Sequence, residues 1–196
     1  MQLKQKQMNT STSTTASNNI FKIIQSESTT SKARCGILLN NTTTPNIICN
    51  TYSCALPLIT PDLIESNKIL KNSIGKLPLV IPVEDVILEK DAFNKTNNIH
   101  QHSNISASNL IFFAPRLCGT LLSGPSNDKQ LTVETVQGRR GITVDAYFSL
   151  MNCIQADINI SLCDEVPNDA SKNRHDKSVR RTLNWLKDLL NKNSVF

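Results

Sequence analysis

The stretch that decides the fold is residues 131–190, which read LTVETVQGRRGITVDAYFSLMNCIQADINISLCDEVPNDASKNRHDKSVRRTLNWLKDLL. Its apolar residues follow the order of a strand, a helix, a second strand and a second helix. Residues 131–136 predict the first strand, and the alternation of apolar and polar residues over 158–162 predicts the second. This order is typical of an α/β fold with a parallel sheet, in which chemistry sits at the carboxyl ends of the strands.

Both helices of this stretch have a predicted start and a predicted apolar stripe. Thr143 is placed to cap the first helix and Ser171 to cap the second, and residues 138–141 (GRRG) predict a turn. The two stripes are expected to be Val144, Tyr147, Phe148, Met151 and Ile154 in the first helix and Val179, Leu183, Leu186 and Leu190 in the second. We expect both stripes to face the sheet.

Upstream of this stretch, short apolar segments are separated by polar ones. Three segments predict the strands of a small antiparallel sheet: residues 20–24, 33–39 and 46–51. Residues 40–45 predict a turn within it, and Thr60 followed by Pro61 predicts a helix start. The polar run 91–108 predicts a flexible loop, and residues 109–114 predict a strand buried on both faces.

Composition sets the organisation of the chain. Residues 1–19 are a polar, low-complexity segment that predicts a disordered tail, and residues 20–196 predict one folded domain. No apolar run approaches the roughly 18 residues that a membrane-spanning helix needs, so no membrane span is predicted. With one Trp and two Tyr, a stacking platform for single-stranded nucleic acid is disfavoured.

The net charge of +5 is concentrated in residues 171–192, which hold seven basic and two acidic residues. Such a segment serves an acidic partner such as RNA, or it is a solvated helix face. Arg174, Arg180 and Lys187 lie off the predicted stripe, so we expect them to face solvent or a partner and take them as candidate RNA-binding residues.

Asp164 and Glu165 follow the second predicted strand directly. A carboxylate in this place accepts hydrogen bonds from an amidine- or guanine-like edge, or acts as an acid or base; alternatively, the two residues are a cap or a surface pair.

The six cysteines have no disulfide-framework spacing, which favours reduced thiols. His100 and His102 have no nearby cysteine, so no metal site is expected in this chain.

Short motifs stand in a fixed order in two parts of the chain. They are ARCGIL at 33–38, TP at 44–45 and ITPDLI at 59–64 in the first part, and ITVD at 142–145, QADI at 155–158, DE at 164–165 and SVRRTLNW at 178–185 in the second. In order and spacing they resemble the tRNA-guanine transglycosylases, a family that exchanges a guanine in tRNA for queuine or a precursor. The resemblance covers about 84 residues of an N-terminal portion.

The resemblance implies a partial TIM (β/α) barrel preceded by a small antiparallel β-sheet. It also places Asp164 on the base-recognition Asp of the family, as a substrate-binding residue. In the family a Cys follows two residues later, whereas this chain has Val166.

One departure from the family bears on function. Catalytic members carry an Asp-Ser-Gly-Gly motif between the two parts, but no Asp-Ser-Gly occurs in this chain, and residues 109–119 read NLIFFAPRLCG where the motif would fall. This implies a non-catalytic accessory subunit of the eukaryotic queuine enzyme, which forms a heterodimer with a catalytic subunit and acts on tRNA. The alternatives are a divergent catalytic transglycosylase and a basic RNA-binding fragment without a role in modification.

The resemblance also bears on cofactor and location. The nucleophilic Asp and the zinc ligands of the family lie beyond residue 196, so no catalytic residue and no zinc are expected in this chain. The implied location is cytoplasmic, either free or peripheral to the mitochondrial outer membrane.

Overall fold

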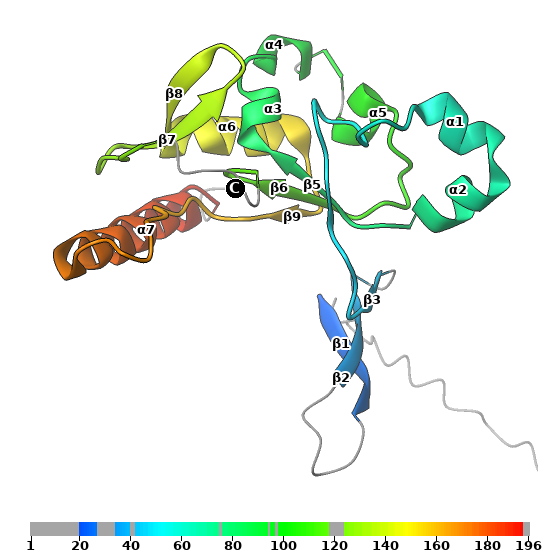
Figure 1. Ribbon diagram of the computed structural model, residues 1–196, viewed down its shortest axis with the longest axis horizontal. Helices are drawn as coiled ribbons and strands as arrows, with labels where there is room; N and C mark the ends of the chain where they lie inside the picture. The colour runs from blue at the N-terminus through cyan, green and yellow to red at the C-terminus, as the bar shows by residue number, and fades with distance from the viewer. Residues whose placement is uncertain are drawn as a thin grey trace, which may run out of the picture. The chain divides into compact units, whose positions relative to one another are not determined.

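The computed structural model (Figure 1) describes residues 20–26, 34–39, 42–74, 76–93, 95–96, 98–117 and 124–193. The chain forms two compact units, residues 1–45 and residues 46–196. The predicted disordered tail, residues 1–19, lies outside the described residues.

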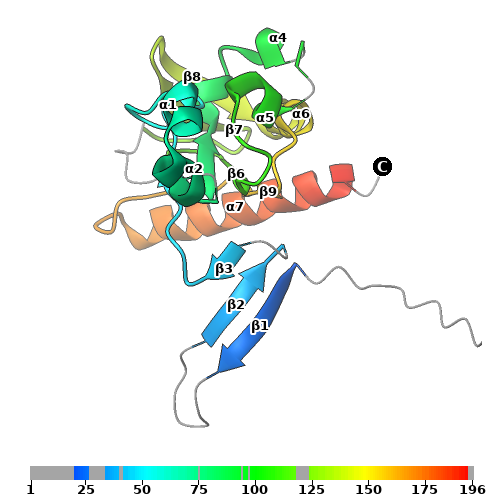
Figure 2. The ribbon, with the colours of Figure 1, turned by 90° about the vertical axis from the view of Figure 1, so that its right-hand side faces the viewer.

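The first unit is a three-stranded antiparallel sheet in the order β1-β2-β3 (Figure 2), which confirms that a small antiparallel sheet precedes the rest. Its strands are β1 (Phe21–Ser26), β2 (Arg34–Leu38) and β3 (Thr42–Thr44). The third strand is not the one expected, because residues 42–44 were predicted to be a turn. Three successive β-branched threonines pair with the end of β2 instead, from Gly36 opposite Thr44 to Leu38 opposite Thr42.

The second unit contains a four-stranded parallel sheet in the order β4-β5-β6-β9. Its strands are β4 (Cys49–Asn50), β5 (Leu79–Pro82), β6 (Ile111–Ala114) and β9 (Ile158–Asn159). β4 comes from the segment expected to complete the antiparallel sheet, and β6 is the predicted buried strand. The described strands form an open sheet, so the α/β class is confirmed while the barrel stays a prediction.

A short hairpin lies beside this sheet and corrects two expectations. β7 (Gln130–Thr135) pairs antiparallel with β8 (Gly138–Thr143) and is not part of the parallel sheet. The GRRG segment is therefore the start of a strand, and the turn falls at residues 136–137. Gly138 follows that turn with φ +95°, which is a conformation that favours glycine.

Seven helices are described: α1 (Pro61–Ser66), α2 (Lys68–Ile74), α3 (Val83–Val86), α4 (Lys90–Phe93), α5 (Ile99–Ser103), α6 (Val144–Ile154) and α7 (Lys172–Asn193). α1 starts at Pro61 as predicted. α4 and α5 lie in the segment expected to be a flexible loop. They are ordered because Phe93 and Ile99 are fully buried, and because Asn98 caps α5 by accepting a hydrogen bond from the Gln101 amide.

Helix α6 covers the core of the second unit. Its predicted cap is confirmed, since Thr143 accepts a hydrogen bond from the Ala146 amide at 3.2 Å. The buried side chains of the helix are Val144, Tyr147, Leu150 and Ile154. Leu150 thus lies inward, while the predicted stripe residues Phe148 and Met151 are half-buried.

Tyr147 links α6 to the chain that follows β9. Its ring stacks on Phe113, and its hydroxyl donates a hydrogen bond to the Ile160 carbonyl at 2.5 Å. Removing the hydroxyl in Tyr147→Phe is expected to lower the free energy of unfolding by about 1 kcal/mol, because the ring packing is retained and one hydrogen bond is lost. Urea denaturation measures this loss, and unchanged stability would show that the bond contributes nothing.

Helix α7 is capped as predicted but packs through a different face. The Arg174 amide donates to Ser171 Oγ at 3.4 Å, and Figures 1 and 2 both show the helix lying next to β9. The buried residues of the helix are Ser178, Trp185 and Leu189. The predicted stripe is wrong for three of its four residues, since Val179, Leu183 and Leu190 are 60%, 51% and 57% exposed, while Leu186 is half-buried.

Candidate functional site

Asp164 lies after β9, and helix α7 fixes its main chain with two hydroxyl groups. The Asp164 amide donates a hydrogen bond to Thr182 Oγ1 at 3.0 Å, and the Ser178 hydroxyl donates to the Asp164 carbonyl. Ser178 and Thr182 are one helical turn apart, so they reach the same point of the facing chain. This contact explains why polar residues occupy the inward face of α7.

The Asp164 carboxylate is buried against two arginines of the same helix. Arg174 donates two hydrogen bonds, Nη1 to Oδ2 at 2.7 Å and Nη2 to Oδ1 at 2.8 Å, and Arg181 Nη1 donates to Oδ2 at 3.0 Å. The Asp164 side chain is 1% exposed, against 26% for Arg174 and 16% for Arg181. Burial alone would raise the pKa of Asp164, but these hydrogen bonds and positive charges outweigh it and hold the pKa below its ordinary value.

The same helix also holds the segment that precedes β7. Arg181 Nε pairs with Asp128 Oδ1 at 2.6 Å, Arg181 Nη1 donates to the Ser126 carbonyl at 2.9 Å, and Trp185 Nε1 donates to the Asp128 carbonyl at 3.2 Å. The SVRRTLNW motif therefore acts as a clamp that joins the chain after β9 to the entry of the hairpin. Sequence reasoning identified the motif but did not find this role.

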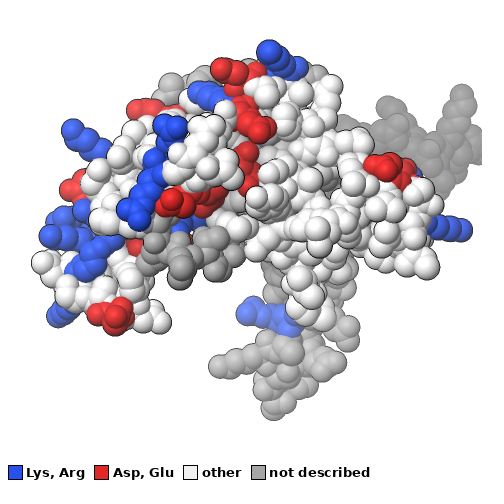
Figure 3. All heavy atoms as spheres, turned by 45° about the horizontal axis from the view of Figure 1, so that its top comes forward, with Lys and Arg blue, Asp and Glu red and all other residues white. Residues whose placement is uncertain are grey.

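The structure separates the predicted RNA-binding residues. Arg174 was expected to face solvent or a partner; its guanidinium is paired with the Asp164 carboxylate, and its side chain is 26% exposed. Arg180 and Lys187 are exposed, as expected. Figure 3 shows basic side chains gathered on the α7 side of the second unit, with acidic side chains beside them. RNA binding by these residues stays a prediction.

A second charged cluster follows β5 and β6 and was missed from the sequence. Arg116, two residues after β6, has a side chain only 6% exposed and lies 3.5 Å from Glu165. Glu84 Oε1 accepts from the Leu117 amide at 3.4 Å, and Asp85 Oδ2 accepts from the Cys54 amide at 3.0 Å. Burial is the main cause that raises the pKa of both carboxyls.

The signal for this cluster was an acidic pair placed directly after an apolar strand. Glu84 and Asp85 come two and three residues after β5, just as Asp164 and Glu165 follow the chain beyond β9. Because the carboxyl ends of parallel strands meet at one edge of a sheet, such pairs converge there. The sequence does not predict β5, because Pro78 and Pro82 break the apolar run, and prolines argue against an interior strand.

Cys163 gives a chemical test of this edge of the sheet. Its thiol donates to Glu165 Oε1 at 3.6 Å, and burial, aided by the charge of Glu165, raises its pKa to about 11. We expect alkylation at pH 8 to be much slower at Cys163 than at the exposed Cys35, because the thiolate is the nucleophile.

Glu165→Gln is expected to speed alkylation of Cys163 by roughly threefold to tenfold, because it removes the negative charge that helps to raise the pKa of the Cys163 thiol. Time-resolved labelling followed by mass spectrometry measures both sites in one sample. An unchanged rate at Cys163 would show that Glu165 does not influence the thiol.

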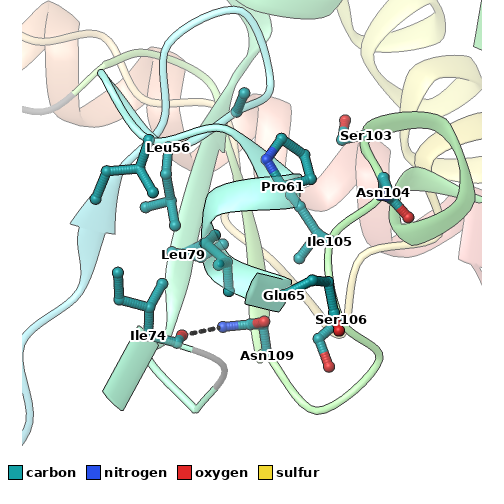
Figure 4. Close-up of a pocket in the computed structure, with 13 residues that line it drawn as sticks. Leu56, Pro61, Glu65, Ile74, Leu79, Ser103, Asn104, Ile105, Ser106 and Asn109 are labelled. Carbon is teal, nitrogen blue, oxygen red and sulfur yellow. Dashed lines mark hydrogen bonds between the residues drawn. The ribbon is translucent and has the colours of Figure 1, made fainter. Parts of the chain in front are cut away.

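A pocket of about 240 Å³ lies elsewhere in the second unit (Figure 4). It is lined mainly by apolar side chains, with Glu65 and Ser103 among the polar ones. Leu79 at the start of β5 and Asn109 just before β6 also line it, so it lies near the amino ends of these strands. It is therefore apart from Asp164, at the edge opposite to the one where α/β folds place their chemistry.

Within the described ranges, no group of three or more His, Cys, Asp or Glu side chains is placed to hold a metal ion. No ligand set for the zinc that the resemblance implies is therefore found among the described residues. Among the helices that the structure describes, none is long and apolar enough to cross a membrane.

Comparison with known proteins agrees with the resemblance seen in the sequence. A family model described as queuine tRNA-ribosyltransferase matches residues 28–195. The chain is 28% identical over 150 residues to a queuine tRNA-ribosyltransferase accessory subunit 2 of Trichoplax adhaerens. These residues are 75% of this chain and 39% of that protein, so the chain spans well under half of its relative. The chain belongs to the queuine tRNA-ribosyltransferase family.

Proposed function

We propose that this chain is the N-terminal part of a non-catalytic accessory subunit, which supports the exchange of guanine for queuine in tRNA by a catalytic partner subunit. Family membership supports a role in queuine modification of tRNA. The relative named as an accessory subunit favours the accessory class. The partner, the tRNA substrate, a cytoplasmic location and zinc ligands outside these 196 residues are parts of the same proposal.

The observation that carries the proposal is the sequence after β6. The strand ends at Ala114 and is followed by Pro115 and Arg116, where catalytic members have an Asp-Ser-Gly-Gly motif. A pyrrolidine ring and a guanidinium offer neither a carboxylate base nor a nucleophile. Asp164, the residue that the resemblance places in base recognition, already accepts hydrogen bonds from two arginines and so is not an available base.

Co-purification tests this proposal. The tagged chain, expressed with a full-length catalytic queuine tRNA-ribosyltransferase from the same source, is expected to retain it through affinity and size-exclusion steps. A tagged unrelated α/β protein is the control for adhesion to the resin. Failure to retain the catalytic subunit would contradict the accessory role.

The exposed basic residues of α7 allow a test of whether the chain contacts tRNA. Arg180 and Lys187 are exposed, so charge reversal at both is expected to weaken tRNA binding by the partnered complex. If both contact phosphates, the slope of log affinity against log salt should fall by about two units or somewhat less. Arg139→Glu in β8, which is also exposed, is the control for a charge reversal away from α7. An unchanged slope in the double variant would leave these residues as a solvated face.

A further inference from the structure

The two hydrogen bonds between Arg174 and Asp164 resemble those by which a carboxylate recognises a guanine-type base. The guanidinium presents two parallel N–H donors to the two carboxylate oxygens, at 2.7 and 2.8 Å. A guanine-type base presents the same pair of donors from its N1–H and 2-amino groups, across one carbon atom. The acceptor that such a base would use is therefore already filled by a side chain of the chain itself.

The two arginines at Asp164 differ in how firmly they are held. Arg181 also bonds to Asp128 and to the Ser126 carbonyl, so it ties three segments together. The guanidinium of Arg174 is directed at Asp164, from the first turn of α7. At 26% exposed, it is the more accessible of the two and lies at the rim of the cluster. Removing Arg174 would therefore expose the carboxylate and leave the clamp in place.

We propose that Arg174 is an internal substitute for the base and excludes guanine-type ligands from Asp164. This inference rests on the proposed position of Asp164 as the counterpart of the base-recognition residue. A tethered side chain competes with an effective concentration in the millimolar range or above. A free base must also break two charge-assisted hydrogen bonds before it can bind. Arg174 thus determines specificity by rejection and keeps this subunit from competing with its partner for the base.

Calorimetric titration with queuine tests the proposal. Arg174→Ala is expected to bind queuine at least tenfold more tightly than the wild-type chain. Lys177→Ala removes the same charge from an exposed position of the same helix and is expected to bind like wild type. The double variant Arg174→Ala/Asp164→Asn is expected to lose the gain, because the gain must act through the carboxylate.

Arg174→Lys guards against loss of structure, since it retains a positive charge beside Asp164 but cannot form the two-donor fork. It is expected to bind queuine with intermediate affinity, and circular dichroism of each variant checks its fold. The proposal is overturned if both Arg174 variants bind queuine no more tightly than the wild-type chain does. Co-purification with the catalytic subunit does not depend on this result, so the two proposals fail separately.

Discussion

Replacing Trp185 with alanine is expected to lower the free energy of unfolding by about 3–5 kcal/mol. Trp185 is 1% exposed, is among the largest fully buried side chains and donates a hydrogen bond to the Asp128 carbonyl. Its loss would leave a cavity between α7 and the chain before β7. Chemical denaturation followed by far-ultraviolet circular dichroism measures the change.

Leu183→Ala is the matched control on the same helix. Leu183 is 51% exposed, so its truncation is expected to change stability by no more than about 0.5 kcal/mol. If Leu183→Ala were as costly as Trp185→Ala, α7 would pack through the stripe expected from the sequence and not through the face described here.

Replacing Asp164 with asparagine is expected to cost about 3 kcal/mol, because the substitution leaves two guanidinium groups without their shared carboxylate. This is the low end of the range for buried pairs, since both arginines reach solvent in part. Glu134→Gln is the control, because it breaks a pair with Arg139 in which both side chains are exposed. That surface pair is expected to contribute about 0.5 kcal/mol or less.

The Asp164 cluster also predicts a pH dependence. The folded-state pKa of Asp164 is lowered, so its contribution to stability is fully present above the ordinary carboxyl pKa of about 4. The contribution is lost as the pH falls from there through the lowered folded-state value. Wild type should therefore lose stability below pH 4 more steeply than Asp164→Asn. Parallel stability curves for the two proteins would contradict the ion-paired state of Asp164.

Local sequence patterns predicted the elements whose boundaries are set by short-range contacts. The Thr143 cap, the Pro61 helix start and the buried strand at β6 depend on neighbours a few residues away, and each is present. The pairing of strands is set by contacts over long stretches of chain. This is why residues 42–44 were predicted as a turn but form a strand.

The inward face of α7 shows why part of the site was not predictable. Counting apolar residues selects Val179, Leu183 and Leu190, which the structure leaves exposed. The inward face instead carries Ser178 and Thr182, whose hydroxyl groups are satisfied by the main chain of Asp164. Polar residues are buried only when a partner is present, and that partner is 14 to 18 positions away in the sequence.

Exchange of labelled guanine into tRNA tests the central claim most directly. Three reactions are compared: the purified chain alone, a catalytic queuine tRNA-ribosyltransferase subunit alone, and the two together. The accessory role predicts no exchange by the chain alone and a higher rate with both proteins than with the catalytic subunit alone. Guanine exchange by the purified chain in the absence of any partner would contradict it.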